Sequence, residues 1–344
     1  MSQATLLPEW ADQSAVLLTW PHAQTDWQPL LDDVTRVYQE LAAAISGRAK
    51  LLIAAPETAH AGIEQALAAV AVTADRYKLF DVASDDTWAR DHGPLTVRGT
   101  TGLKLLDFTF NGWGNKFSSA QDNQITSTLA AAGAFAVPVE SCPLVLEGGA
   151  VEIDEEGTLL TTASCLLNKN RNPELSREAI EQELQQRLGV KKINWLDYGY
   201  LEGDDTDSHI DTLARLTPGQ GLVYVGCDDP ADDHYLEFQR MEQQLVGMTN
   251  ADGQPYHRFR LPWPKAVFGG DGERLPATYA NFLIVNGSVL VPVYRDDKDA
   301  EALSVIGSAF PGYEVIGIDC LALIEQHGSL HCITMQLPEG VISF

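Results

Sequence analysis

The sequence predicts a single α/β domain spanning residues 1–344, built from repeated units that each combine a β-hairpin with a helix. Hairpin patterns recur about every 50–65 residues, and helical segments lie between them. Length alone favours about two domains, but no low-complexity linker interrupts the repeats. One cyclic array of α/β units is therefore expected.

Four segments carry the hairpin pattern of two apolar strands around a polar turn: residues 86–108, 147–162, 208–225 and 278–293. The last of these turns at Asn286-Gly287, one of the strongest short hairpin signals. Residues 329–338 supply only the first strand of a fifth unit. The N-terminal stretch 14–21 is expected to pair with it, which would close the array into a ring.

Apolar residues at helical spacing predict six helices between the hairpins, over residues 29–47, 58–72, 122–135, 175–190, 235–248 and 297–310. The helix within 175–190 has the clearest ends. It opens with Ser176, carries Glu178 and Ala179 in its first turn, and stops at Gly189.

Charge is the most informative feature of the composition. The chain has 23 Lys and Arg against 48 Asp and Glu, a formal net charge of -25. Binding to nucleic acid needs clustered basic residues, so a nucleic-acid partner is not expected. An acidic surface attracts small cations, although solubility alone also explains this charge.

Several signals bear on location and redox environment. No run of 18 or more apolar residues occurs, so neither a transmembrane helix nor a membrane partner is expected. The N-terminus, MSQATLLPEW, lacks the basic and apolar regions of a signal peptide. Five scattered cysteines without a C-x-x-C pair favour a reducing compartment over disulfides or structural zinc. The cytoplasm is the expected location.

When the repeats are aligned by their first strands, each carries a polar residue where an apolar one is expected: Asp91, Glu147, His209 with Asp211, Asn281 and Cys332. A ring would bring these equivalent positions toward one axis. Carboxylates, an imidazole and a thiol that converge on a centre predict a reaction site. Cys332 also has a simpler interpretation as a buried thiol on a strand.

In the stretch GDDTDSHID, four polar residues alternate: Asp205, Asp207, His209 and Asp211. On a strand they would share one face. A zinc site that uses His209 and a solvated acidic face are both open interpretations, but an EF-hand loop does not fit this spacing. Catalytic use of His209 and Asp211 is the favoured hypothesis. Trp88 lies near Asp91 and suits a ligand with an apolar stem and a cationic head.

Seven motifs in order, between Pro8 and Pro338, resemble the agmatine deiminase family, which is related to bacterial peptidylarginine deiminases: LPEWADQSAVLLTWP, DDTWARDHGP, NGWGNKF, LEGGAVEIDEEGTLLTT, CLLNKNRNP, GDDTDSHID and HCIT. The resemblance implies a five-bladed α/β pseudo-propeller. It also implies hydrolysis of agmatine to N-carbamoylputrescine and ammonia, without a metal or organic cofactor.

The same resemblance implies roles for individual residues. Cys332 of HCIT matches the nucleophile, and His209 of DSHID matches the general acid and base. Asp91 and Asp211 match the carboxylates that grip the guanidinium, and Glu147 matches an acidic residue that supports the histidine and the substrate nitrogens. One departure concerns the run before the nucleophile. The family commonly has several glycines there, whereas this chain has only Gly328.

These residue types suit the reaction. Two carboxylates hold a planar guanidinium and fix its carbon for attack by a thiolate, while a histidine transfers protons. Two alternatives remain open: a deiminase acting on free or peptidyl arginine, and a non-deiminase cysteine amidase, which would not need both Asp91 and Asp211.

The acidic run Asp204, Asp205 and Asp207 lies just upstream of His209. We expect it to face the far end of the substrate, where it would favour an ammonium and repel a carboxylate. Arg90 is expected to brace Asp91 and so to be unavailable for that carboxylate. A homo-oligomer remains open.

Overall fold

The computed structural model describes residues 4–344, and within that range five of the sheets share one connectivity. An antiparallel hairpin leads through a helix to a third strand that runs parallel to the second. The strands of the first two such sheets are β5 (Leu95–Gly99), β6 (Gly102–Thr109) and β7 (Val139–Val145), then β8 (Glu152–Ile153), β9 (Thr158–Thr162) and β10 (Lys192–Leu196). The next two contain β11 (Ala214–Thr217), β12 (Gly221–Val225) and β13 (His257–Leu261), then β16 (Leu283–Val285), β17 (Ser288–Val293) and β18 (Glu314–Asp319).

The fifth of these sheets joins the two ends of the chain and confirms the predicted pairing. Strand β19 (Met335–Pro338) runs antiparallel to β2 (Gln13–Thr19), with Met335 opposite Leu17. β2 continues in parallel to β3 (Lys50–Ala55), and β3 to β4 (Tyr77–Asp81). Two smaller pairings complete the strands: β1 (Thr5–Leu6) beside β5, and the hairpin of β14 (Val267–Phe268) with β15 (Arg274–Leu275).

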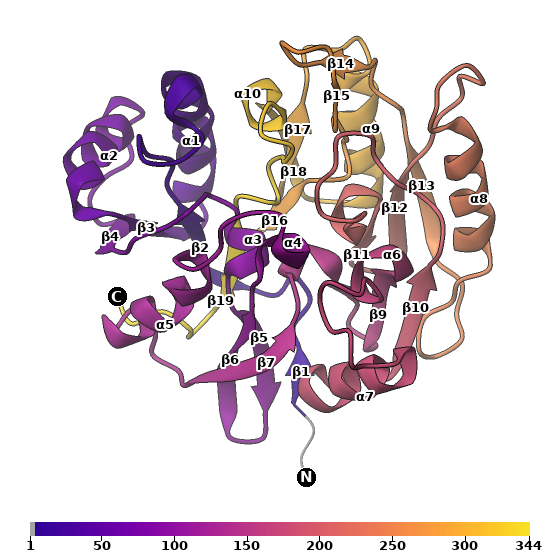
Figure 1. Cartoon of the computed structure of the whole chain (residues 1–344), viewed down its shortest axis with the longest axis horizontal. Coiled ribbons are helices and arrows are strands. Elements are labelled where there is room, and N and C mark those ends of the chain that lie inside the picture. The colour runs from indigo at the N-terminus through magenta and orange to yellow at the C-terminus, as the bar shows by residue number, and fades with distance from the viewer. Residues whose placement is uncertain (1–3) are drawn as a thin grey trace.

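The six predicted helices all form, as α1 (Leu31–Ser46), α2 (Glu57–Ala69), α5 (Ile125–Ala131), α7 (Arg177–Leu188), α8 (Tyr235–Val246) and α9 (Asp299–Ala309). Short helical turns make up the rest: α3 (Ala89–His92), α4 (Gly112–Asn115), α6 (Ala163–Leu166), α10 (Leu321–Ile324) and the 3-10 turns η1 (Gln28–Leu30), η2 (Asp122–Gln124), η3 (Gly148–Ala150) and η4 (Ile210–Thr212). In Figure 1, α1, α2, α5, α7 and α8 lie along the outside, with α3 and α4 near the middle.

Helix α7 shows how local sequence sets these elements. The Ser176 hydroxyl accepts a hydrogen bond from Ala179 N at 3.3 Å and so satisfies one of the free amides of the first turn. Gly189 ends the helix in the left-handed conformation, with φ of 66°. Ile180 and Leu184 recur at a spacing of four residues and are buried, so one stripe of the helix packs on its sheet.

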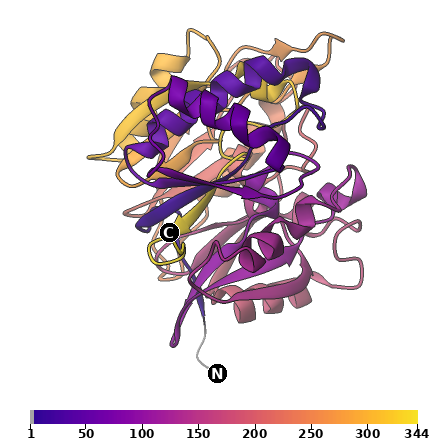
Figure 2. The same ribbon diagram turned by 90° about the vertical axis from the view of Figure 1, so that its left-hand side faces the viewer.

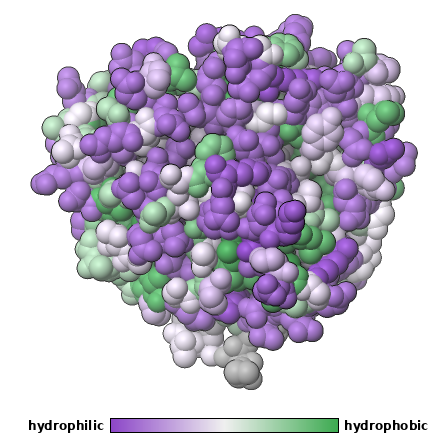
Figure 3. All heavy atoms as spheres, viewed as in Figure 1, coloured by the Kyte–Doolittle hydropathy of each residue, from purple (hydrophilic) through white to green (hydrophobic). Residues whose placement is uncertain are grey.

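Two hydrophobic clusters form the core, one mainly under α1, α8 and α9 and the other mainly under α5 and α7. Figure 2 shows α1 and α2 lying over their sheet from the side. The face in Figure 3 is mainly hydrophilic, in keeping with the acidic composition. None of the helices within residues 4–344 combines the length and apolar character needed to cross a bilayer.

Candidate active site

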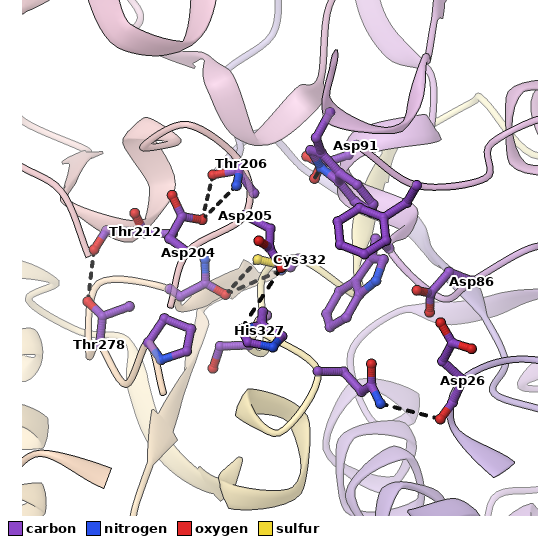
Figure 4. Close-up of a pocket in the computed structure, with 18 residues that line it drawn as sticks. Asp26, Asp86, Asp91, Asp204, Asp205, Thr206, Thr212, Thr278, His327 and Cys332 are labelled. Carbon is purple, nitrogen blue, oxygen red and sulfur yellow. Dashed lines mark hydrogen bonds and ion pairs between the residues drawn. The ribbon is translucent and has the colours of Figure 1, made fainter. Parts of the chain in front are cut away.

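A single pocket collects side chains from several repeats (Figure 4). Its lining includes the indole of Trp88, the carboxylates of Asp91 and Asp205, the amide of Asn281 and the thiol of Cys332. These residues come from four units of the fold, since only Trp88 and Asp91 share one, as the predicted convergence of equivalent positions requires. Among the lining residues there is no Lys or Arg.

The site residues lie in turns that precede the first strands, and not on the strands, which corrects the sequence prediction. Asp91 belongs to α3, Asp211 to η4, and Cys332 to a turn before β19. The stretch before His209 is a loop in which Asp207 and Ser208 have φ of 64° and 68°. These left-handed residues break the extended backbone, so the alternating polar residues do not share one face.

The backbone of Gly149 marks the point where three predicted site residues meet. A Cβ placed on Gly149 would lie 2.6 Å from Nδ1 of His209. The same position is 2.8 Å from Oδ1 of Asp91 and 3.0 Å from Oδ2 of Asp211. Any side chain here would collide with all three groups, which explains the glycine of the LEGGA motif. The structure therefore brings His209, Asp91 and Asp211 together.

Asp91 is held by donors on two sides. Its Oδ2 accepts from Nε1 of Trp113 at 2.8 Å, and its Oδ1 accepts from Gly149 N at 3.0 Å. Burial raises the pKa of Asp91 well above its ordinary value, and the nearby charge of Asp211 adds to the shift. A bound cation would reverse this effect, so the carboxylate is set to ionise when a guanidinium arrives.

Asp211 is oriented by a residue that the sequence prediction missed. Nδ1 of His331 lies 2.7 Å from Oδ2 of Asp211, and Nε2 of the same ring lies 2.7 Å from the carboxylate of Glu9. Burial by itself raises the pKa of Asp211, but the hydrogen bond and charge of His331 outweigh it and leave the pKa below its usual value. Oδ1 of Asp211 is buried and has no hydrogen-bond partner.

Glu9 belongs to the LPEW motif and is itself part of a buried charge network. Arg215 donates to Glu9 Oε2 at 2.8 Å and also contacts the carboxylate of Glu152. In the sequence, the only sign of this charge network is that Glu9 and His331 are polar residues within otherwise apolar motifs. Nothing in that pattern shows that the two residues meet.

Cys332 and His209 are both buried, and burial shifts the pKa of each group toward its uncharged form. Burial raises the pKa of the Cys332 thiol well above its ordinary value, and Asp211 and Asp91 raise it further. Sγ of Cys332 donates to Oδ1 of Asn281 at 3.3 Å. Burial lowers the pKa of His209 to about 3, and neither ring nitrogen has a hydrogen-bond partner. The imidazole is thus neutral, and its Nδ1 lies 3.5 Å from Oδ1 of Asp91.

Glu147 is buried beside His209, but its partner is Arg171. Nε of Arg171 donates to both carboxylate oxygens of Glu147, at 2.8 and 3.0 Å. Glu147, Cys165 and His209 each offer an atom within 4.8 Å of the other two, so they form one of the groups with metal-ligand spacing in residues 4–344. The arginine already supplies positive charge there, which disfavours a metal cation.

The second group with such spacing is Glu9, Glu152 and His331. Here Arg215 lies against both carboxylates, so the same argument applies. No described cluster with metal-ligand spacing is therefore free of a competing arginine.

Two further expectations are corrected. Arg90 does not brace Asp91: its Nη1 donates to Gln336 at 2.6 Å, and its Nη2 lies 3.8 Å from Glu9. Adjacent residues in a helical turn point in different directions, so this pairing was unfavourable. Asp207 does not face the pocket either, because it forms ion pairs with Arg171 and Lys116.

Comparison with known proteins identifies the family. Residues 5–338 match the sequence profile described as Porphyromonas-type peptidyl-arginine deiminase. The chain belongs to this family. Among curated relatives, the agmatine deiminase of Stutzerimonas stutzeri is 34% identical, and the alignment covers 96% of this chain and 94% of the relative.

Solved structures of deiminases share this mixed α/β fold. The agmatine deiminase of C. jejuni, a cysteine-to-serine variant with substrate bound, is 35% identical with a TM-score of 0.91, covering 98% of this chain and 97% of that one. A Porphyromonas gingivalis structure, provisionally named an arginine deiminase, is 48% identical with a TM-score of 0.92, covering 99% and 100%. The family thus includes proteins named for more than one guanidine substrate.

Proposed function

We propose that this protein hydrolyses agmatine to N-carbamoylputrescine and ammonia. The observation that carries the proposal is the convergence of His209, Asp91 and Asp211 around Gly149, together with a pocket that both Asp91 and the Cys332 thiol line. A cysteine amidase would not need both carboxylates. Relatives named agmatine deiminase at about a third identity over nearly the whole chain support the same substrate.

The chemistry follows from the pKa shifts of the buried groups. A guanidinium bound between Asp91 and Asp211 offsets the negative charge that raises the pKa of the thiol, so its binding favours the Cys332 thiolate. The thiol proton passes to His209. Sulfur then adds to the guanidinium carbon, and His209 delivers the proton to the departing nitrogen, which leaves as ammonia.

A planar thiouronium remains on Cys332 after ammonia leaves. Water adds to its carbon and gives a proton to His209. The carbon–sulfur bond then breaks as His209 returns its proton to the sulfur, and the added hydroxyl loses its proton to form the carbonyl, so that the released ammonia departs as ammonium. A carboxylate oxygen of Glu147 lies within 4.8 Å of a ring nitrogen of His209, close enough to influence the ring electrostatically. The ion pair of Glu147 with Arg171 fixes the position of this carboxylate.

The mouth of the pocket favours an ammonium at the far end of the substrate. Asp26, Asp86, Asp204 and Asp205 line it together with the face of Trp88, while Lys and Arg are absent from the lining. The α-carboxylate of arginine would lie near these aspartates, and no lysine or arginine of the lining could pair with it. Such an unpaired charge is costly in a partly closed site.

We therefore expect kcat/KM for agmatine to exceed that for free arginine by about 10³-fold. Arginine within a peptide should be equally poor. Ammonia release from the three substrates, compared at one pH and one salt concentration, tests this. Arginine turnover within tenfold of agmatine would move the protein to the activity for which its Porphyromonas gingivalis relative is named.

Asp91→Asn should lower kcat/KM for agmatine at least ~10²-fold, or about 2.7 kcal/mol of transition-state stabilisation. The amide keeps the shape of the carboxylate but cannot ionise when the guanidinium binds. Steady-state kinetics measure the loss. Asp107→Asn, on β6 and outside the pocket lining, is the matched control and should retain activity. Unchanged kcat/KM in the Asp91 variant would return that residue to a structural role.

We also infer that the repeated units form a single five-bladed pseudo-propeller domain. We further infer that the enzyme works in the cytoplasm, either as a monomer or as a homo-oligomer. The shared connectivity of five sheets and the pairing of β19 with β2 support the ring. The free thiols of all five cysteines fit a reducing compartment.

A further inference from the structure

Trp113 has a backbone conformation that a bulky side chain rarely adopts. Its φ of 54° and ψ of 49° lie in the left-handed region, and it is the only Trp, Tyr or Phe within residues 4–344 with a positive φ. Glycine and asparagine tolerate this region, whereas a large aromatic residue there is an outlier. Such strained residues persist only where the surrounding structure holds them, and they cluster at active sites.

The strain belongs to a whole turn. Residues 112–115, which form α4, are all left-handed, with φ of 66°, 54°, 83° and 65°. Oδ1 of Asn111 accepts from a backbone amide of this turn at 2.9 Å, and its Nδ2 donates to the carbonyl oxygen of Asn170 at 3.0 Å. On the other side, Nζ of Lys116 donates to the carbonyl oxygen of Asp205 at 2.6 Å. The turn is therefore fixed to two neighbouring loops.

Aromatic packing fixes the indole ring of Trp113 as well. Phe110 and Phe117 both meet it edge to face, with ring centroids 5.0 and 5.6 Å away. The residue is buried, with 6% of its surface exposed. Its one polar side-chain atom, Nε1, donates to Oδ2 of Asp91 at 2.8 Å. The turn and the packing together thus fix the position of a single hydrogen-bond donor.

This donor acts on a carboxylate that must be charged and correctly oriented. An indole N–H can only donate, so it favours the ionised form of Asp91. Burial and the charge of Asp211 raise the pKa of Asp91, and the hydrogen bond from Trp113 opposes that rise. Because the amide of Gly149 holds the other oxygen, the two donors together set the plane of the carboxylate. A bidentate pair with a planar guanidinium depends on that plane.

We propose that Trp113 is a positioning residue for the deimination: its indole N–H holds the Asp91 carboxylate in the orientation that receives the guanidinium. The left-handed turn is the backbone conformation that aims this donor. Trp113 and Asp91 line the same pocket, so the effect passes through one hydrogen bond. This role rests on the proposed function, because it acts on the reaction only through the contact of Asp91 with the guanidinium.

Trp113→Phe removes the donor and keeps an aromatic ring between Phe110 and Phe117. We expect kcat/KM for agmatine to fall ~30-fold, the size of one hydrogen bond to a charged group. Trp195→Phe on β10 is the matched control, because this indole is equally buried and donates to Glu181 at 2.7 Å, outside the pocket lining. Both variants should lose similar amounts of melting temperature, but only Trp113→Phe should lose activity.

Trp113→His separates the hydrogen bond from the packing. Imidazole is smaller than a phenyl ring, so packing alone would make this the weaker variant. One orientation of the imidazole, however, places an N–H where the indole has its own. At pH 8, where an imidazole of ordinary pKa is neutral, we expect kcat/KM about fivefold above that of Trp113→Phe. A Trp113→His variant no more active than Trp113→Phe would overturn the role of the hydrogen bond.

A double-variant cycle tests whether Trp113 acts through Asp91. In an Asp91→Asn background there is no charge to hold, so Trp113→Phe should lower kcat/KM less than about threefold. Equal losses in the two backgrounds would overturn the positioning role. Turnover of arginine but not of agmatine by the wild type would overturn the proposed function instead, and the same variants measured with arginine would then decide the role of Trp113.

Discussion

Cys332→Ala should abolish turnover of agmatine, with kcat/KM falling by at least ~10⁴-fold. The substitution removes the only thiol in the lining of the pocket, so no covalent adduct can form on the guanidinium carbon. The fold should survive, because only one sulfur atom is lost from a buried position and the cost is about 1 kcal/mol. Ammonia release, together with the melting temperature, measures both effects.

Cys142→Ala is the matched control for this prediction. Cys142 is equally buried, but it lies on β7 and its sulfur contacts Arg187. Its loss should leave kcat/KM unchanged. Mass spectrometry of the wild type during turnover should also detect the adduct that Cys332→Ala cannot form. Retention of even a tenth of the wild-type rate in Cys332→Ala would exclude a covalent mechanism.

His209→Asn should lower kcat for agmatine by about 10⁴-fold, because one imidazole serves both half-reactions. Burial lowers the pKa of His209 to about 3, so the ring is neutral at physiological pH, and a proton can reach it from the thiol only when the bound guanidinium favours the thiolate. Asparagine fills a similar space but cannot carry a proton between sulfur, nitrogen and water. KM should change far less than kcat, since Asp91 and Asp211 still hold the guanidinium.

Pre-steady-state kinetics separate the two half-reactions in this variant. Loss of both should remove the initial burst of ammonia as well as steady turnover, whereas loss of hydrolysis alone would leave a burst of one ammonia per site. His257→Asn, on the exposed part of β13, is the control and should match the wild type. A full burst in His209→Asn would assign the first proton transfer to another group.

The repeated units and the predicted helices were accessible from sequence because they rest on local patterns. Alternating apolar strands, the Asn286-Gly287 turn and the capping residue Ser176 each act within a few residues. Even the pairing of residues 14–21 with 329–338 followed from one unit lacking half of its hairpin. The convergence of polar residues was accessible for a similar reason, since each repeat carried at least one polar exception and the third carried two, His209 and Asp211.

The directions of the site side chains were not accessible in the same way. The alternating polar residues predicted a strand, but Asp207 and Ser208 have left-handed backbone and belong to a loop. The contact of His331 with Asp211 joins segments far apart in the chain, and no periodicity reports such a meeting. Arg90 donates to Gln336, a partly buried residue on β19, and not to Asp91.

The pairing of β19 with β2 also has a consequence for the order in which the protein matures. Met335 and Leu17 are roughly 300 residues apart in the chain, so this contact belongs to the slow, non-local class of folding events. During synthesis on a ribosome, the edge of β2 that faces away from β3 stays unpaired until β19 has been synthesised. The turn that presents Cys332 leads directly into β19. A nascent or partly refolded chain can therefore hold its other hairpins intact and still be inert, and the appearance of activity marks the pairing of β19 with β2.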